Sequence, residues 1–166
     1  MGKTFVLIFT VIIFLFPISS FAFLDVDWVF YKSDDYGFQL KLHKGTRFMA
    51  TDFGEGWEGK TGVFNTIKYL IAVKLGPEET EINIQKSLAR TINIPAEQWS
   101  NLKEGKNNSG WEWYKVIKAS KDETLYIGGY GFGLKGNYII LMKTNNTDFE
   151  TNEAEYLEWF TSIQLF

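Results

Sequence analysis

Three strand patterns in the second half of the sequence, separated by short connections, constrain the fold most. Residues 111–119, 124–132 and 138–143 are rich in apolar, aromatic and β-branched side chains, and only a few polar or glycine residues separate them. Connections this short join antiparallel strands, because a parallel pair needs a crossover of about a dozen residues or more. The sequence therefore predicts an antiparallel sheet.

Three further strands are expected in the first half. Residues 28–32 and 36–42 flank the turn-forming residues 33–35, and residues 67–75 alternate in polarity with the period of a strand.

Two helices are expected to cover this sheet. The first starts after Pro77 and stops before Pro95, and residues 96–102 add a short second turn. The closing helix starts at a capping box, Thr147 to Glu150. The expected apolar stripes are Ile82, Leu88, Ala89 and Ile92 on the first helix and Phe149, Tyr156, Leu157 and Phe160 on the second. These elements predict an α+β domain, a mostly antiparallel sheet flanked by helices.

Glycines crowd one predicted strand. Gly129, Gly131 and Gly133 alternate with Tyr130 and Phe132, and Gly128 precedes them. Glycine in a strand costs up to about 1 kcal/mol, so this bare face needs a reason. We expect the closing helix to pack against it, and Gly131→Val to overpack that contact.

The N-terminus has the pattern of an export signal. Lys3 precedes an apolar run over residues 5–16, Pro17 ends the run, and Ser20 and Ala22 are the small residues of a cleavage site. We therefore expect residues 1–22 to be a signal peptide and residues 23–166 to form a single domain in the periplasm or the extracellular medium. Only an uncleaved signal would attach it to a membrane.

Charge and cysteine content exclude several functions. The formal net charge is −3 and the basic residues are scattered, which argues against nucleic-acid binding. With no cysteine, disulfides, thiolate metal sites and cysteine catalysis are impossible.

Two glycine motifs match the residue patterns of nucleotide-binding sites but lack the chemical and structural context that such sites need. Residues 54–61 fit the P-loop expression, but Glu55 and Glu58 would repel phosphates and Trp57 would block their approach, so a glycine-rich loop is expected. Residues 131–136 spell G-x-G-x-x-G, yet the next expected element is a strand and not the required helix. We expect neither a nucleotide nor any other cofactor.

Other polar residues offer little chemistry. His43 is the single histidine and is expected to be structural. Asp25, Asp27, Asp34 and Asp35 lack the spacing of a calcium loop, and no metal site is expected. The carboxylates Asp52, Glu55 and Glu58 leave open a small hydrolase, for which no catalytic residue can be assigned.

The tryptophans are the most distinctive side chains. Trp111 and Trp113 are two residues apart on a predicted strand and would share one face. That face belongs either to the core or to a surface that binds a protein or a carbohydrate. Together with Tyr130 and Phe132, they are the candidate binding surface.

The residues 36–45, YGFQLKLHKG, the central helix, the strand meander and a closing WFTSI at residues 159–163 resemble the PsbP/DcrB-like family of extracytoplasmic domains. The resemblance implies an antiparallel sheet flanked by helices. It also implies a non-catalytic module that docks onto protein assemblies of the envelope or membrane.

Overall fold

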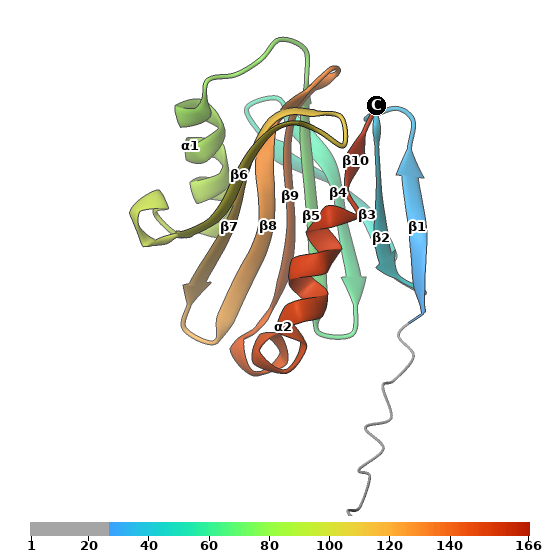
Figure 1. Cartoon of the computed structure of the whole chain (residues 1–166), viewed down its shortest axis with the longest axis vertical. Coiled ribbons are helices and arrows are strands. Elements are labelled where there is room, and N and C mark those ends of the chain that lie inside the picture. Colours follow the sequence, from blue (N-terminus) through green and yellow to red (C-terminus); the bar gives the residue numbers. More distant parts are fainter. Residues whose placement is uncertain (1–26) are drawn as a thin grey trace, which may run out of the picture.

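The computed structural model describes residues 27–166 and shows two sheets and two long helices (Figure 1). The expected signal peptide and Asp25 lie outside the described residues. The large sheet has seven strands in the spatial order β3 (Arg47–Gly54), β4 (Trp57–Phe64), β5 (Ile67–Leu75), β9 (Gly136–Asn145), β8 (Thr124–Gly133), β7 (Trp111–Lys121) and β6 (Ser100–Asn108). The small sheet has the order β1 (Trp28–Ser33), β2 (Phe38–His43) and β10 (Gln164–Leu165). Every strand pair is antiparallel, which confirms the expected fold class.

The large sheet separates two hydrophobic cores. On one face, helix α1 (Glu81–Ile92) packs against β7, β8 and β9, and we call this layer the α1 core. The opposite face is covered by helix α2 (Asn146–Thr161) and by the small sheet, and this layer is the α2 core. Figure 1 shows the two helices on opposite sides of the large sheet.

Helix α1 begins and ends with side-chain and backbone caps. The Thr80 side chain accepts a hydrogen bond from the Asn83 amide, and Asn93 adopts a left-handed conformation at the C-terminal end. The expected apolar stripe needs one correction, because Ile82 is 63% exposed and Ile84 is fully buried in its place. A short 3₁₀ turn, Ala96–Gln98, follows where a second turn was expected.

Helix α2 begins two residues earlier than expected. The Asn145 side chain accepts a hydrogen bond of 2.7 Å from the Asp148 amide, so Asn145 is the cap and the capping box at Thr147 is wrong. The buried face of the helix includes Trp159, whereas Leu157 is 41% exposed. Asparagine competes as well as threonine for this cap position, and the sequence offers both.

Four strands were not expected from the sequence: β3, β4, β6 and the short C-terminal β10. Strands β3 and β4 form a hairpin, so the segment predicted as a glycine-rich loop is a tight turn at Gly54–Gly56 followed by a strand. Glu55 has a positive φ of 56° between two glycines that also have positive φ. Strand β6 pairs with β7 at the far edge of the sheet. Its side chains are almost all exposed, which explains why no apolar pattern marks it.

The bare glycine face of β8 does lie under α2. A Cβ atom at Gly129 would come within 2.2 Å of the Phe160 ring, which shows how closely α2 approaches. At Gly131 the obstacle is different, because a Cβ atom there would lie 2.1 Å from the Trp113 carbonyl oxygen on β7. The expectation that Gly131→Val collides with the helix is therefore corrected to a collision with the neighbouring strand.

Side chains of α2 complete the edge of β2. Strand β10 pairs with β2 only at Phe38 and Gln39. Farther along, the Lys41 amide donates to Ser162 Oγ at 3.0 Å, and its carbonyl accepts from Trp159 Nε1 at 2.8 Å. Two side chains thus replace the next strand, and β2 keeps its backbone groups satisfied.

Candidate functional site

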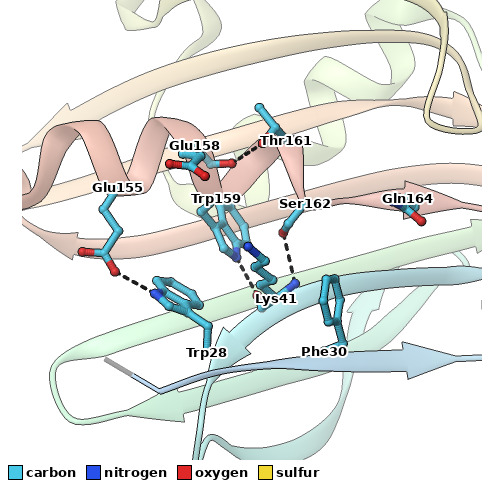
Figure 2. Close-up of a pocket in the computed structure, with 9 residues that line it drawn as sticks. All are labelled: Trp28, Phe30, Lys41, Glu155, Glu158, Trp159, Thr161, Ser162 and Gln164. Atoms are coloured by element: carbon cyan, nitrogen blue, oxygen red, sulfur yellow. Dashed lines mark hydrogen bonds between the residues drawn. The ribbon is translucent and has the colours of Figure 1, made fainter. Parts of the chain in front are cut away.

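A groove lies between the outer face of β1–β2 and the C-terminal half of α2 (Figure 2). It has a volume of about 390 Å³. We call it the β1–α2 groove, lined by Trp28, Phe30, Lys41, Glu155, Glu158, Trp159, Thr161, Ser162 and Gln164.

Hydrogen bonds between α2 and β2 fix the floor of the groove. The hydrogen bonds from Trp159 and Ser162 to the Lys41 backbone hold α2 against β2 at this point. Trp159 is 3% exposed, so its ring belongs mainly to the α2 core and only borders the groove. The groove is therefore built into the packing of two elements and needs no rearrangement to exist.

Two aromatic rings form one side of the groove. They project from β1 toward α2 in Figure 2, since Trp28 and Phe30 lie on the same face of the strand. The indole Nε1 of Trp28 donates to Glu155 Oε1 at 2.8 Å, which fixes the ring. Phe30 is 64% exposed, an unusual position for a large aromatic side chain.

Carboxylates form the opposite side. Helix α2 carries Asp148, Glu150, Glu153, Glu155 and Glu158 and has no lysine or arginine in its sequence. Glu155 and Glu158 line the groove directly, while Lys41 projects from β2 with its Nζ 5.9 Å from the centre of the Phe30 ring. The groove thus places aromatic faces opposite negative charges, with one ammonium group already between them (Figure 2).

His43 lies in the α2 core, at the end of β2. Its ring is 4% exposed and stacks on Phe64, with ring centres 4.6 Å apart, and its Nδ1 shares a hydrogen bond with the Tyr69 hydroxyl. Burial lowers the pKa of His43 from 6.5 to about 4, against the opposing attraction of Asp148. Burial raises the pKa of Tyr69. His43 is accordingly a neutral packing residue, the structural role expected for it.

A second polar group lies at the start of α2. The hydroxyls of Tyr156 and Thr144 both donate to Asp148 Oδ2, the first at 2.5 Å. Burial, followed by the hydrogen bond to the Asp148 carboxylate, raises the pKa of Tyr156. This cluster satisfies the polar atoms of buried residues and faces no cavity described here.

The expected aromatic surface is not one surface. Glu112 is an extra residue in β7, because Trp111 pairs with Gly133 and Trp113 pairs with the adjacent Phe132. This β-bulge reverses the alternation, so Trp111 points into the α2 core and Trp113 into the α1 core. The two tryptophans are 2% and 8% exposed. The expectation that they share a face is therefore wrong. The bulge could not be foreseen because no sequence pattern marks it.

The other two members of the expected surface accompany Trp113 in the α1 core. Tyr130 is fully buried, its ring centre 5.8 Å from that of Trp113, and Phe132 stacks on Trp113 while remaining partly exposed. Lys115 pairs with Glu81 beside them, and Gln85 donates to the Tyr130 hydroxyl at 2.8 Å. The packing leaves no open platform for a sugar ring at this place.

The carboxylates considered for a hydrolase lie on the β3–β4 hairpin. Asp52 and Glu58 are direct cross-strand neighbours, and Glu55 at the turn pairs with Arg90 of α1. They border an open concavity of about 550 Å³. Asp52 Oδ1 accepts from the Gly54 amide at 2.7 Å, an ordinary contact for a turn residue.

Neither glycine motif has the geometry of a phosphate site. Lys60 of the P-loop pattern lies on β4 and donates to the Tyr31 hydroxyl at 2.6 Å. The residues after the second motif form β9, a strand, as expected. Among residues 27–166, no three histidine or acidic side chains gather as metal ligands, and no helix is long and apolar enough to cross a membrane.

Sequence reasoning missed the groove. Trp28 and Phe30 were recognised only as strand residues, and Glu155 and Glu158 belong to a helix whose polar face resembles any solvated face. The available signal was the spacing of Trp28 and Phe30, two residues apart on a predicted strand, which puts both rings on one face.

The layers define the class of fold, an antiparallel sheet between helices, and the structural comparison identifies it as PsbP-like. The solution structure of cyanobacterial PsbP (CyanoP) from Synechocystis sp. PCC 6803 superimposes with a TM-score of 0.59 at 11% identity, covering 90% of this chain and 99% of that chain. The PsbP-like fold expected from the sequence is thereby confirmed, while the DcrB part of the resemblance remains an expectation. No family model and no curated protein matches the sequence.

Proposed function

We propose that this protein is a non-enzymatic, exported binding module that docks onto an envelope or membrane protein assembly through the β1–α2 groove. The observation that carries the proposal is the groove with the exposed Phe30 ring among its lining residues. Exposed aromatic side chains beside a fixed, partly polar wall are typical of protein-binding sites.

The places on which the two alternative functions depend offer less support than the groove. The hydrolase alternative depends on the β3–β4 hairpin, where Glu55 is engaged by Arg90 and Asp52 by a turn amide. The carbohydrate alternative depended on Trp111 and Trp113, which lie in two separate cores. No observation favours either function over docking.

Site-specific photo-crosslinking tests the proposal. A photoreactive residue replaces Phe30 in the groove or, as a control, Lys106 on the distant edge strand β6. In intact cells we expect a discrete adduct from position 30, identified by mass spectrometry as an envelope or membrane protein, and none from position 106. Equal labelling from both positions, or none from position 30, would contradict the proposal.

The export part of the proposal rests on residues 1–22. We expect the exported protein to begin at Phe23, after cleavage behind Ala22. The intact mass of the protein recovered from the periplasm or medium measures this directly. Recovery of the full-length chain from the cytoplasm alone would contradict it.

A further inference from the structure

We propose that the β1–α2 groove recognises a basic, extended segment of its protein partner by taking a lysine or arginine side chain between the aromatic pair and the α2 carboxylates. This inference rests on the proposed function and names the chemistry of the partner. Its three supports are the aromatic faces, the charge of α2 and the position of Lys41.

The aromatic faces supply the first part of a cation site. The faces of tryptophan and phenylalanine rings attract ammonium and guanidinium groups within about 6 Å. Phe30 is 64% exposed, and Trp28 is held in place by its hydrogen bond to Glu155. Both rings also offer apolar surface to the methylene stem of a long basic side chain.

The charge of α2 supplies the second part. Five carboxylates and no basic side chain give this helix a negative field that favours cations on approach. Glu158 is exposed at the groove, and within residues 27–166 its side chain makes no hydrogen bond or ion pair. A basic partner can therefore pair with Glu158 without displacing an internal contact.

Lys41 indicates which ligand the groove prefers. Its backbone is fixed by Trp159 and Ser162, but its ammonium group lies over the Phe30 ring at 5.9 Å and, among the described residues, within 4.0 Å of no carboxylate. The chain thus places its own cation where the partner's would bind. Lys41 then competes with the partner's basic side chain for this position, so removal of its charge strengthens binding of the partner.

Fluorescence anisotropy with a labelled peptide of alternating lysine and serine tests the inference on the folded, exported protein. We expect saturable binding that weakens with added salt and disappears when the same peptide is acetylated at every lysine. Phe30→Ala should weaken binding about two- to fivefold, the value of one exposed cation–π contact. Glu158→Gln should weaken binding to a similar extent, about two- to fivefold, as for an exposed ion pair.

Matched variants separate the groove from general charge effects. Glu97→Gln removes an exposed carboxylate on the α1 side, and Leu134→Ala removes an apolar side chain that is 80% exposed elsewhere. Both should leave binding unchanged, whereas Lys41→Met, which keeps the stem and loses the charge, should tighten it. Circular dichroism confirms that each variant is folded.

Several outcomes would overturn the inference. They are absence of binding, equal binding of the acetylated peptide, equal losses in the control variants, and weaker binding by Lys41→Met. Phe30-dependent binding to phosphatidylcholine vesicles in preference to the peptide would assign the cation site to a lipid instead. If position 30 still crosslinks an envelope protein in any of these cases, the proposed function stands and only the basic partner is wrong.

Discussion

At Gly131 the neighbouring strand occupies the space that any larger side chain would need. A Cβ atom there would lie 2.1 Å from the Trp113 oxygen, whereas at Gly62 the nearest atoms belong to the movable side chains of Phe48 and Thr46, at 2.9 Å. We expect Gly131→Ala to cost about 1 to 3 kcal/mol and Gly62→Ala distinctly less. Urea unfolding of the two variants measures the difference, and equal losses would contradict a backbone collision.

Burial of neutral His43 makes stability depend on pH. The pKa is about 4 in the folded protein and 6.5 when the ring is exposed, so the unfolded chain binds the proton more tightly. The free energy of unfolding that neutral His43 contributes is therefore fully present above pH 6.5 and is lost as the pH falls toward 4. We expect this loss to be on the order of 2 kcal/mol.

A His43→Gln variant removes this titration. We expect its free energy of unfolding to change less between pH 6.5 and pH 4 than that of the unmodified protein. Chemical denaturation across this range gives both curves. Parallel curves would show that another group causes the pH dependence.

At the scale of elements, the two candidate caps of α2 give a matched test. Asn145→Ala removes the side chain that accepts from the Asp148 amide and should cost about 1 kcal/mol. Thr147→Ala removes a hydroxyl that makes no hydrogen bond among the described residues and should change stability by less than about 0.5 kcal/mol. Thermal melting compares them, and the reverse order would restore the capping box at Thr147.

Elements with a strong apolar period could be predicted, and those without one could not. Strands β5, β7, β8 and β9 alternate between two buried faces and were recognised from sequence, as was the need for a helix over the glycines of β8. Strand β6 faces solvent and has no such period. The bulge at Glu112 left no signal in composition, so the candidate surface at Trp111 and Trp113 failed. The groove depends on which residues meet across distant elements, which periodicity does not encode.

At the scale of the whole molecule, the last residues hold the small sheet in place. Leu165 is buried, its amide donates to the Ser109 carbonyl at 2.8 Å, and the Phe166 amide donates to the Gly37 carbonyl at 2.9 Å. Deleting residues 164–166 should cost about 2 to 5 kcal/mol, mainly by removing the Leu165 side chain. Hydrogen exchange should accelerate first in β2 and leave β8 protected, while Gln164→Ala, an exposed change, should alter neither. Uniform acceleration in both strands would contradict this local role.

Strand β2 can form its last hydrogen bonds only after α2 and β10 have been synthesised. The contacts that Lys41 makes with Trp159 and Ser162 span 118 and 121 residues of sequence. The β1–β2 hairpin leaves the ribosome early, and a lone hairpin is only marginally stable in water. Until almost the entire chain has been translated, the edge of β2 at Lys41 lacks the Trp159 and Ser162 side chains that complete it. We expect this open edge to be accessible to a chaperone during that interval.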